Sequence, residues 1–145
     1  MDLVPLIFTD NVILKWNTLT IIKSKNGSIF GGYLDKAWDS IDAWRCDCNA
    51  FLYSLINKNN KPFKAKIYSR DGFNAINCNP LHGPIFGSGC DIFISTSSKI
   101  NSNSYCNFGY TYRHPDYRYQ STELNLYLPV DFHFKQLKLK FTPKF

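Results

Sequence analysis

Short runs of β-branched and apolar residues, separated by polar turns, dominate the pattern along the chain. Residues 18–22 and 29–33 form two such runs. The Asn26-Gly27 pair between them is a strong hairpin signal, because both residues accept the positive φ of a type I′ turn. The pattern therefore predicts a β-hairpin over residues 18–33.

The next two runs predict a pair of neighbouring strands. Residues 50–56 are continuously apolar except for one serine, which is typical of a strand buried on both faces. Residues 63–68 alternate apolar and polar side chains, as an antiparallel partner with one solvated face would. Further short strands are expected at residues 75–78, 91–95, 105–112 and 125–128.

One segment has a different period. Trp38, Ile41 and Trp44 recur at helical spacing, and Asp35 is suited to cap a helix that begins there. The segment is short and follows two glycines. The sequence therefore leaves two alternatives for residues 35–44, one or two turns of helix or a wide loop.

The C-terminal segment predicts a last strand with an irregularity. Apolar residues alternate with polar ones, but their parity changes between residues 134 and 137, so we expect a β-bulge near residues 135 and 136. Most of its apolar residues should lie in the core, namely Phe132, Phe134, Leu137, Leu139 and Phe141. The basic residues on its opposite side should form a solvated ridge or a docking edge for an acidic partner, namely Lys135, Lys138, Lys140 and Lys144.

About nine strands and little helix predict a mainly β fold, a two-sheet antiparallel β-sandwich. The length of 145 residues fits a single domain over residues 1–145, and 44% hydrophobic residues suffice for a core. The net charge of +6 favours polyanionic partners without choosing among them. The sequence shows neither a signal peptide nor a long apolar run, so we expect an intracellular protein without a transmembrane segment.

The five cysteines are expected to be free thiols, since an odd number without a secretion signal argues against a disulfide framework. Cys46 and Cys48 are separated by one residue, which is too close for a usual zinc half-site. We expect both to be buried or half-buried small apolar residues. No metal or cofactor is predicted.

The glycine-rich stretch at residues 83–91 is not a phosphate-binding loop. It lacks the Lys-Ser/Thr of a P-loop, and a strand rather than a helix follows it. The glycines instead let the backbone turn tightly before the next strand. At least two of four glycines should have positive φ or touch neighbouring backbone closely, namely Gly31, Gly32, Gly87 and Gly89.

No local pattern predicts a catalytic site. His82, His114 and His133 do not pair at ligand spacing, and each is expected to be a surface or turn residue. A nucleophilic Cys90 or Cys106 beside a histidine stays open, because such partners meet only in the fold. Residues 110–119 interleave aromatic and basic side chains, which is typical either of a single-stranded nucleic-acid platform or of a Tyr-rich strand with solvated arginines.

Three motifs together resemble the TLDc family. The first motif, residues 18–24 and 30–33 followed by a tryptophan, is similar to the opening of the family's central sheet. The second, residues 47–55, is similar to its D-x-N-A-F-L-F-S-L strand. The third, residues 83–92, is similar to its glycine-rich signature. The resemblance runs from about residue 17 to residue 141. Its signature positions are Gly31, Gly32, Trp38, Asn49, Phe51, Gly83, Pro84, Phe86, Gly87, Gly89 and Asp91.

The resemblance implies a β-sandwich with a few short helices and a non-catalytic intracellular interaction module. It further implies a link to oxidative-stress resistance and, as in several members, binding to the vacuolar proton pump. It carries over no catalytic residue. Two alternatives remain, a thiol-based redox-protective protein and a single-stranded nucleic-acid binder.

Two features depart from the family pattern. Only residues 1–17 precede the first motif, so we expect a domain that lacks part of the family's N-terminal segment. The last strand is basic over residues 136–139, where the family is commonly acidic. We expect Lys135, Lys138 and Lys140 to change which protein partner that strand can bind.

Overall fold

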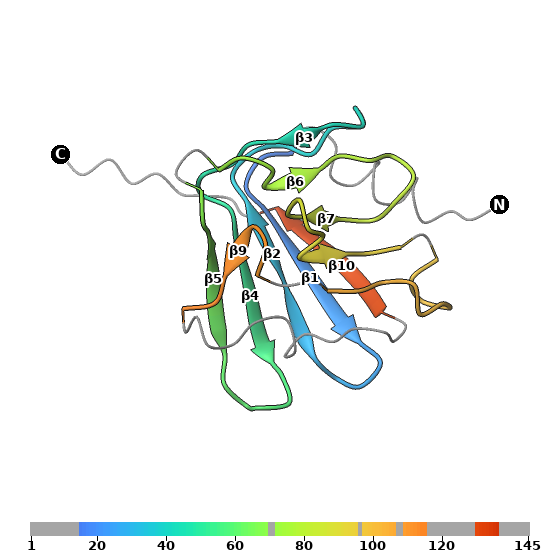
Figure 1. Cartoon of the computed structure of the whole chain (residues 1–145). Helices are drawn as coiled ribbons and strands as arrows, with labels where there is room; N and C mark the ends of the chain where they lie inside the picture. Colours follow the sequence, from blue (N-terminus) through green and yellow to red (C-terminus); the bar gives the residue numbers. More distant parts are fainter. Residues whose placement is uncertain (1–14, 70–71, 96, 107–108, 116–129, 137–145) are drawn as a thin grey trace.

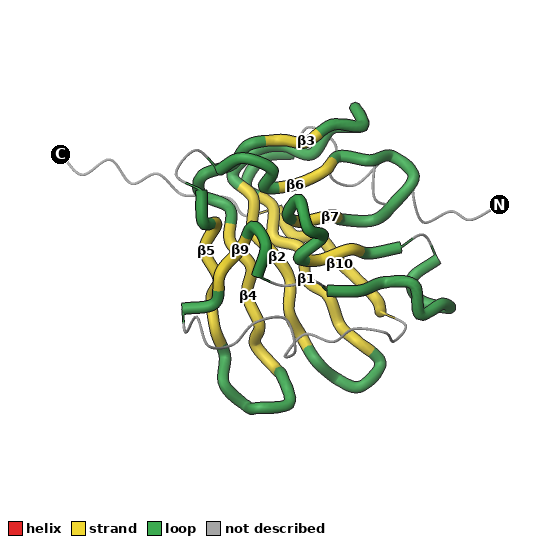
Figure 2. The backbone as a smooth tube through the Cα atoms, in the orientation of Figure 1, coloured by secondary structure: helices red, strands yellow, loops and turns green. Residues whose placement is uncertain are grey.

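The computed structural model describes residues 15–69, 72–95, 97–106, 109–115 and 130–136, the last of these by their backbone alone. These residues form ten strands and no helix (Figures 1 and 2). The strands are β1 (Thr18–Ser24), β2 (Ile29–Leu34), β3 (Trp44–Arg45), β4 (Phe51–Ile56), β5 (Phe63–Ile67), β6 (Ile76–Asn77), β7 (Ile85–Phe86), β8 (Ile92–Phe93), β9 (Tyr112–Arg113) and β10 (Val130–Gln136).

The strands form two antiparallel sheets, as the sequence predicted. One sheet has the order β10-β1-β2-β4-β5-β9 and the other the order β3-β6-β7-β8. In Figure 1, β3, β6 and β7 lie across the upper end of the larger sheet, while the β1–β2 and β4–β5 hairpins extend away from them. The few short helices that the family resemblance implied are absent from the described residues.

The core lies between the two sheets. Every second residue of β1 is buried, and β2 and β4 turn apolar side chains toward the same interior. The largest fully buried side chains come from both sheets and from the loop after β2, namely Trp38, Tyr112, Phe30, Phe86, Ile22, Leu34, Leu52, Ile76, Ile92 and Ile94.

The β1–β2 hairpin is confirmed, but its turn differs from the predicted type. The Gly27 N–H donates to the Ser24 carbonyl at 2.9 Å, and the Ser24 N–H donates to the Ser28 carbonyl at 3.0 Å. Gly27 has φ 91°, whereas Asn26 is not among the residues with positive φ. This arrangement is a turn followed by a left-handed glycine, which closes a longer hairpin loop than a type I′ turn does.

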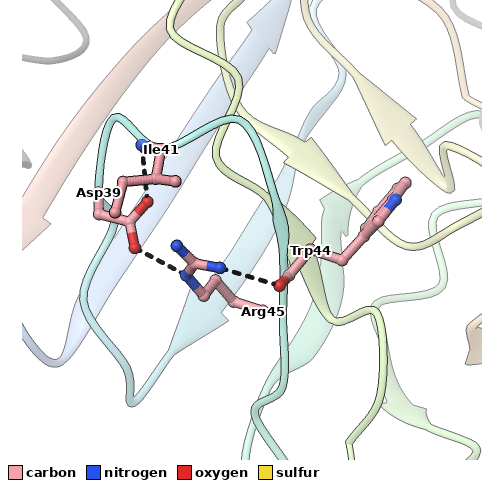
Figure 3. Close-up of polar contacts among 4 residues, drawn as sticks. All are labelled: Asp39, Ile41, Trp44 and Arg45. Carbon is pink, nitrogen blue, oxygen red and sulfur yellow. Dashed lines mark hydrogen bonds and ion pairs between the residues drawn. The ribbon is translucent and has the colours of Figure 1, made fainter.

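Residues 35–44 form the wide loop and not the helix. Trp38 is fully buried, but Ile41 and Trp44 are 65% and 40% exposed, so the three do not share a buried helical face. Asp39 holds the loop by accepting hydrogen bonds from the Arg45 Nε at 2.7 Å and the Ile41 N–H at 3.0 Å (Figure 3). Partial burial opposes ionisation of Asp39, yet these hydrogen bonds outweigh it and leave its pKa below the ordinary value.

Strand β4 is buried on both faces only in its middle, which corrects the sequence-based prediction. Phe30 of β2 pairs with Ser54 and Ile29 pairs with Ile56, so Leu55 is an extra residue in β4. Such a bulge turns consecutive side chains out of the regular alternation. Leu55 and Ile56 are accordingly 55% and 50% exposed.

The C-terminal strand is confirmed as β10, an edge strand of the larger sheet. All seven of its residues pair with β1 without a register shift, from Val130 opposite Ser24 to Gln136 opposite Thr18. The bulge expected near residues 135 and 136 is therefore not present up to Gln136. The predictions for Leu137, Leu139 and Phe141 concern residues outside the described part, and the core positions of Phe132 and Phe134 stay predictions.

The prediction for the four glycines is confirmed by two of them. Gly87 has φ 81°, and a Cβ at Gly31 would overlap the backbone carbonyl oxygen of Thr20. The other two are close to side chains and not to backbone. A Cβ at Gly32 would lie 2.5 Å from the Phe86 ring, and one at Gly89 would clash with the Tyr110 ring.

Gly31→Ala should lower the free energy of unfolding by about 3 kcal/mol, the sum of overpacking and a lost buried hydrogen bond. The Tyr53 hydroxyl crosses Gly31 to donate to the Thr20 carbonyl at 2.8 Å, and a methyl group would displace it. Chemical denaturation of the variant measures the loss. Gly27→Ala is the control, because its Cβ would meet nothing within 4 Å and it should lose only about 1 kcal/mol from its positive φ. Equal losses in the two variants would contradict the packing argument.

Candidate functional site

The glycine-rich motif forms the β7–β8 hairpin and its approach. The Gly83 N–H donates to the Ile94 carbonyl at 2.9 Å, and Pro84 and Phe86 are buried. Gly87 turns the chain, with the Cys90 N–H donating to its carbonyl at 2.9 Å. The interpretation of this stretch as a tight turn, and not a phosphate-binding loop, agrees with the structure. The sequence pattern did not predict that β7 is itself a strand.

Asp91 ends this turn as a fully buried carboxylate. It accepts hydrogen bonds from the backbone N–H groups of four successive residues, 109–112, at 2.9–3.3 Å. Burial raises the pKa of Asp91, while the four N–H groups oppose that rise because they stabilise the charged form. Since residues 109–112 lead into β9 of the larger sheet, Asp91 ties the two sheets together.

Asp47, in the motif at residues 47–55, is a second buried carboxylate that accepts backbone N–H groups. It is buried, and its carboxylate accepts the N–H groups of Asp35 at 2.7 Å, Lys36 at 2.9 Å and Asn49 at 2.9 Å. The Asn49 amide donates to the Asp35 carboxylate at 3.0 Å. These bonds join the loop after β2 to the start of β4. The sequence pattern included Asp47 in the motif but gave no sign that it would be buried.

Aromatic residues complete the signature. The rings of Trp38 and Phe86 meet edge to face with centroids 5.5 Å apart, and Gly32 leaves the space that Phe86 fills. Phe51 lies on the outward face, where its ring stacks on Tyr33 with centroids 5.1 Å apart. Most signature residues therefore have a structural role, since they either hold loops through hydrogen bonds or pack in the core.

Two of the three histidines pack on aromatic rings. The His82 ring lies 5.1 Å from that of Phe93, and the His114 ring lies 4.3 Å from that of Phe63, measured between centroids. His133 lies in β10 opposite Ile21. The described residues hold no group of three His, Cys, Asp or Glu side chains arranged to bind a metal ion.

The cysteines are all free, as expected, but their exposure differs from the prediction. Cys46 and Cys48 are exposed rather than buried, because the buried residue of this segment is the Asp47 between them. Cys78 and Cys106 are buried and Cys90 is half-buried. Burial raises the pKa of Cys78 to about 11 and that of Cys106 well above its ordinary value.

Alkylation of the native protein with iodoacetamide near pH 8 should therefore divide the thiols into two classes. Cys46 and Cys48 should react, whereas Cys78 and Cys106 should react about 100-fold more slowly, because their thiolates are scarce and shielded. Peptide mass spectrometry over a time course measures each rate. Urea-unfolded protein is the control, in which all five thiols should react alike. Fast modification of Cys106 in native protein would contradict this burial.

The segment at residues 110–119 does not form a continuous stacking platform in its described part. Tyr110 is exposed, but Tyr112 is fully buried and its hydroxyl donates to the Ala75 carbonyl at 2.7 Å. Arg113 is half-buried and pairs with the exposed Lys66, so it lies on the face of β9 away from the core, as the alternative of a Tyr-rich strand expected. Residues 116–119 lie outside the described part of the chain.

The basic C-terminal ridge is described only at its start. Lys135 lies in the edge strand β10 opposite Leu19 of β1. Lys138 and Lys140 lie outside the described residues, so the ridge stays a prediction.

Sequence reasoning missed a second basic surface, on the outward face of the larger sheet. Lys64 and Lys66 project from β5, and the register places Lys66 opposite Arg113 of β9. The alternation in residues 63–68 signalled a solvated face, but it could not show that Arg113 lies beside it. No helix among the described residues is long and apolar enough to cross a membrane.

Comparison with known proteins finds a family model that matches the chain. The family model described as the TLDc domain matches residues 7–127, which is most of the 145-residue chain. No curated protein matches the chain. The match covers all three motifs and both sheets except β10, and the chain belongs to the TLDc domain family.

Proposed function

We propose that this TLDc domain is a non-catalytic, intracellular protein-interaction module. The proposal is supported mainly by the two buried carboxylates of the motifs, because both are engaged in hydrogen bonds with the backbone. Asp91 accepts four backbone N–H groups and Asp47 accepts three, so both buried acids serve to hold loops in place. A rigid scaffold of this kind suits binding through exposed surfaces.

Family membership supports a more specific role. We propose that the domain contributes to oxidative-stress resistance and that the vacuolar proton pump is a partner, as the family resemblance implies for several members. Purified tagged full chain immobilised on beads should retain the solubilised pump from a vacuolar membrane extract. Beads that carry heat-unfolded chain are the control.

Two results would contradict parts of this proposal. If the beads retain other proteins but not the pump, the pump is not a partner, and the proposal of a protein-interaction module still holds. Recovery of no protein above the unfolded control would remove the interaction module itself.

A second candidate, a thiol-based protective protein, is favoured by the exposure of Cys46 and Cys48. In this case the thiols themselves react with peroxide, which oxidises a thiolate sulfur to a sulfenic acid and is reduced to water. The variant Cys46→Ser/Cys48→Ser separates the two roles in cells challenged with hydrogen peroxide. Unchanged protection supports the interaction module, and loss of protection by a folded variant supports the thiol role.

A further inference from the structure

Three cations lie together on the outward face of the larger sheet. Lys64 and Lys66 alternate with the buried Ala65 in β5, so both point away from the core. Arg113 of β9 pairs with Lys66 across the strands. Strands β1, β2, β4, β5 and β9 contain no Asp or Glu, and the one acid of the remaining strand, Asp131 of β10, lies at the opposite end of the sheet order from β5 and β9. The strands around the three cations therefore contain no carboxylate.

Aromatic rings hold two of these cations in place. The Lys64 Nζ lies 3.9 Å from the centroid of the Phe51 ring, and the Arg113 guanidinium carbon lies 3.3 Å from that of Tyr68. A cation that rests on a ring still has N–H groups directed to solvent. The one ion pair among the described residues joins Arg45 to Asp39, in a different part of the fold. The cation cluster of Lys64, Lys66 and Arg113 is thus pre-positioned for carboxylates.

Exposed apolar side chains lie on the same sheet. The bulge in β4 places Leu55 and Ile56 in solvent, and Ile56 pairs with the half-buried Ile29. Strand β4 is also the neighbour of β5, with Tyr53 opposite Lys64. The face therefore combines a cationic part and an apolar part within neighbouring strands.

We propose that this face binds an acidic segment of a partner protein that also carries apolar side chains. The acidic side chains bind the cation cluster, and the apolar ones cover Leu55 and Ile56. This inference names a surface and a partner chemistry for the interaction module proposed above, and it rests on that function.

Charge complementarity selects the acidic partner, and the rings argue against single-stranded nucleic acid. Stacked bases need open aromatic faces. Here Lys64 covers one face of Phe51 and Tyr33 stacks on the ring as well, while Arg113 covers a face of Tyr68. Phosphates would also leave the apolar part of the face without contacts.

The test uses the full chain and a defined probe. The probe is a fluorescent peptide of about twelve residues that alternates Glu with Leu, long enough when extended to cross six strands about 4.8 Å apart. Fluorescence anisotropy compares wild type with Lys64→Glu/Lys66→Glu. The matched control is Lys25→Glu/Lys36→Glu, which changes two exposed loop lysines and lowers the net charge equally, from +6 to +2.

We expect wild type to bind the peptide and the Lys64/Lys66 variant to bind it at least about tenfold more weakly. The loop control should lose no more than about twofold to threefold, which is the effect of net charge alone. Lys66→Glu, which leaves the contact of Lys64 with Phe51 intact, should lose an intermediate amount. Leu55→Ser should also weaken binding of the Glu-Leu peptide. It should not weaken binding of a poly-Glu peptide of the same length, which has no apolar side chains to cover Leu55. Thermal unfolding shows whether each variant is folded.

Three outcomes would overturn the proposal. These are no binding of the peptide by wild type, equal losses in the two double variants, and tighter binding of an oligothymidine of similar charge that depends on the same lysines. If wild type retains its partner from the membrane extract and the Lys64/Lys66 variant retains it equally, the face is wrong while the interaction module stands. If neither chain retains a protein, the proposed function itself fails.

Discussion

Asp91→Ala should lower the free energy of unfolding by about 3–5 kcal/mol, a large part of the roughly 5–15 kcal/mol of a typical domain. Asp91 is fully buried, and its carboxylate is the acceptor for the N–H groups of residues 109–112. Alanine would leave these donors without that acceptor, and the N–H groups of Thr111 and Tyr112 would lose it in a buried setting. Chemical denaturation followed by tryptophan fluorescence measures the loss.

Two further variants separate the causes of this loss. Asp42→Ala removes an exposed carboxylate and should change stability by less than about 0.5 kcal/mol. Asp91→Asn keeps an acceptor oxygen at the Oδ1 position, which all four N–H groups reach, but it loses the negative charge and places an NH₂ group against the Thr111 N–H that also reaches Oδ2. It should therefore be destabilised, although by less than Asp91→Ala. An Asp91→Asn protein as stable as wild type would show that shape, rather than the charged acceptor, holds the loop.

The longer strands of the large sheet were predictable because their signals are local, whereas β7 and most of the strand expected at residues 105–112 show that short segments were not. The alternation in residues 63–68 and the Asn26-Gly27 signal need only near neighbours in sequence. The strand and the hairpin that they predict are both present, although the turn is not of type I′. The wide loop at residues 35–44 was left undecided because Trp38, Ile41 and Trp44 fit a helix equally well. Contacts with distant residues decide it, chiefly the packing of Trp38 on Phe86 and the Asp47 carboxylate that accepts the loop N–H groups.

The candidate surface was harder to predict than the scaffold. The glycines of the motifs are recognisable by type and order, so the tight turn at residues 83–91 followed from the sequence. The burial of Asp47 and Asp91 and their hydrogen bonds to distant loops did not. The cation cluster depends on the pairing of Lys66 with Arg113, which are far apart in the chain. The bulge that exposes Leu55 and Ile56 likewise arises from the register between β2 and β4 and has no mark in the apolar run itself.

Deletion of residues 132–145 should abolish cooperative unfolding, although chain ends often tolerate truncation. The deletion removes five of the seven residues that pair with β1, residues 132–136. At about 1 kcal/mol net for each hydrogen bond of the ladder, this amounts to about 5 kcal/mol before any loss of packing. That loss is as large as the whole stability of a marginal domain.

Hydrogen exchange would locate the damage that this deletion causes. Without β10, strand β1 becomes the edge of the larger sheet, and the N–H groups of β1 that point toward β10 lose their partners. Protection should fall first in β1, while β4 and β5 at the other side of the sheet stay protected longest. Deletion of residues 137–145 is the companion variant, because it leaves every described β1–β10 pair intact and should keep β1 protected. A 132–145 deletion that still unfolds cooperatively, with β1 protected as in wild type, would show that β10 is dispensable and that β1 and β2 alone complete that side of the sheet.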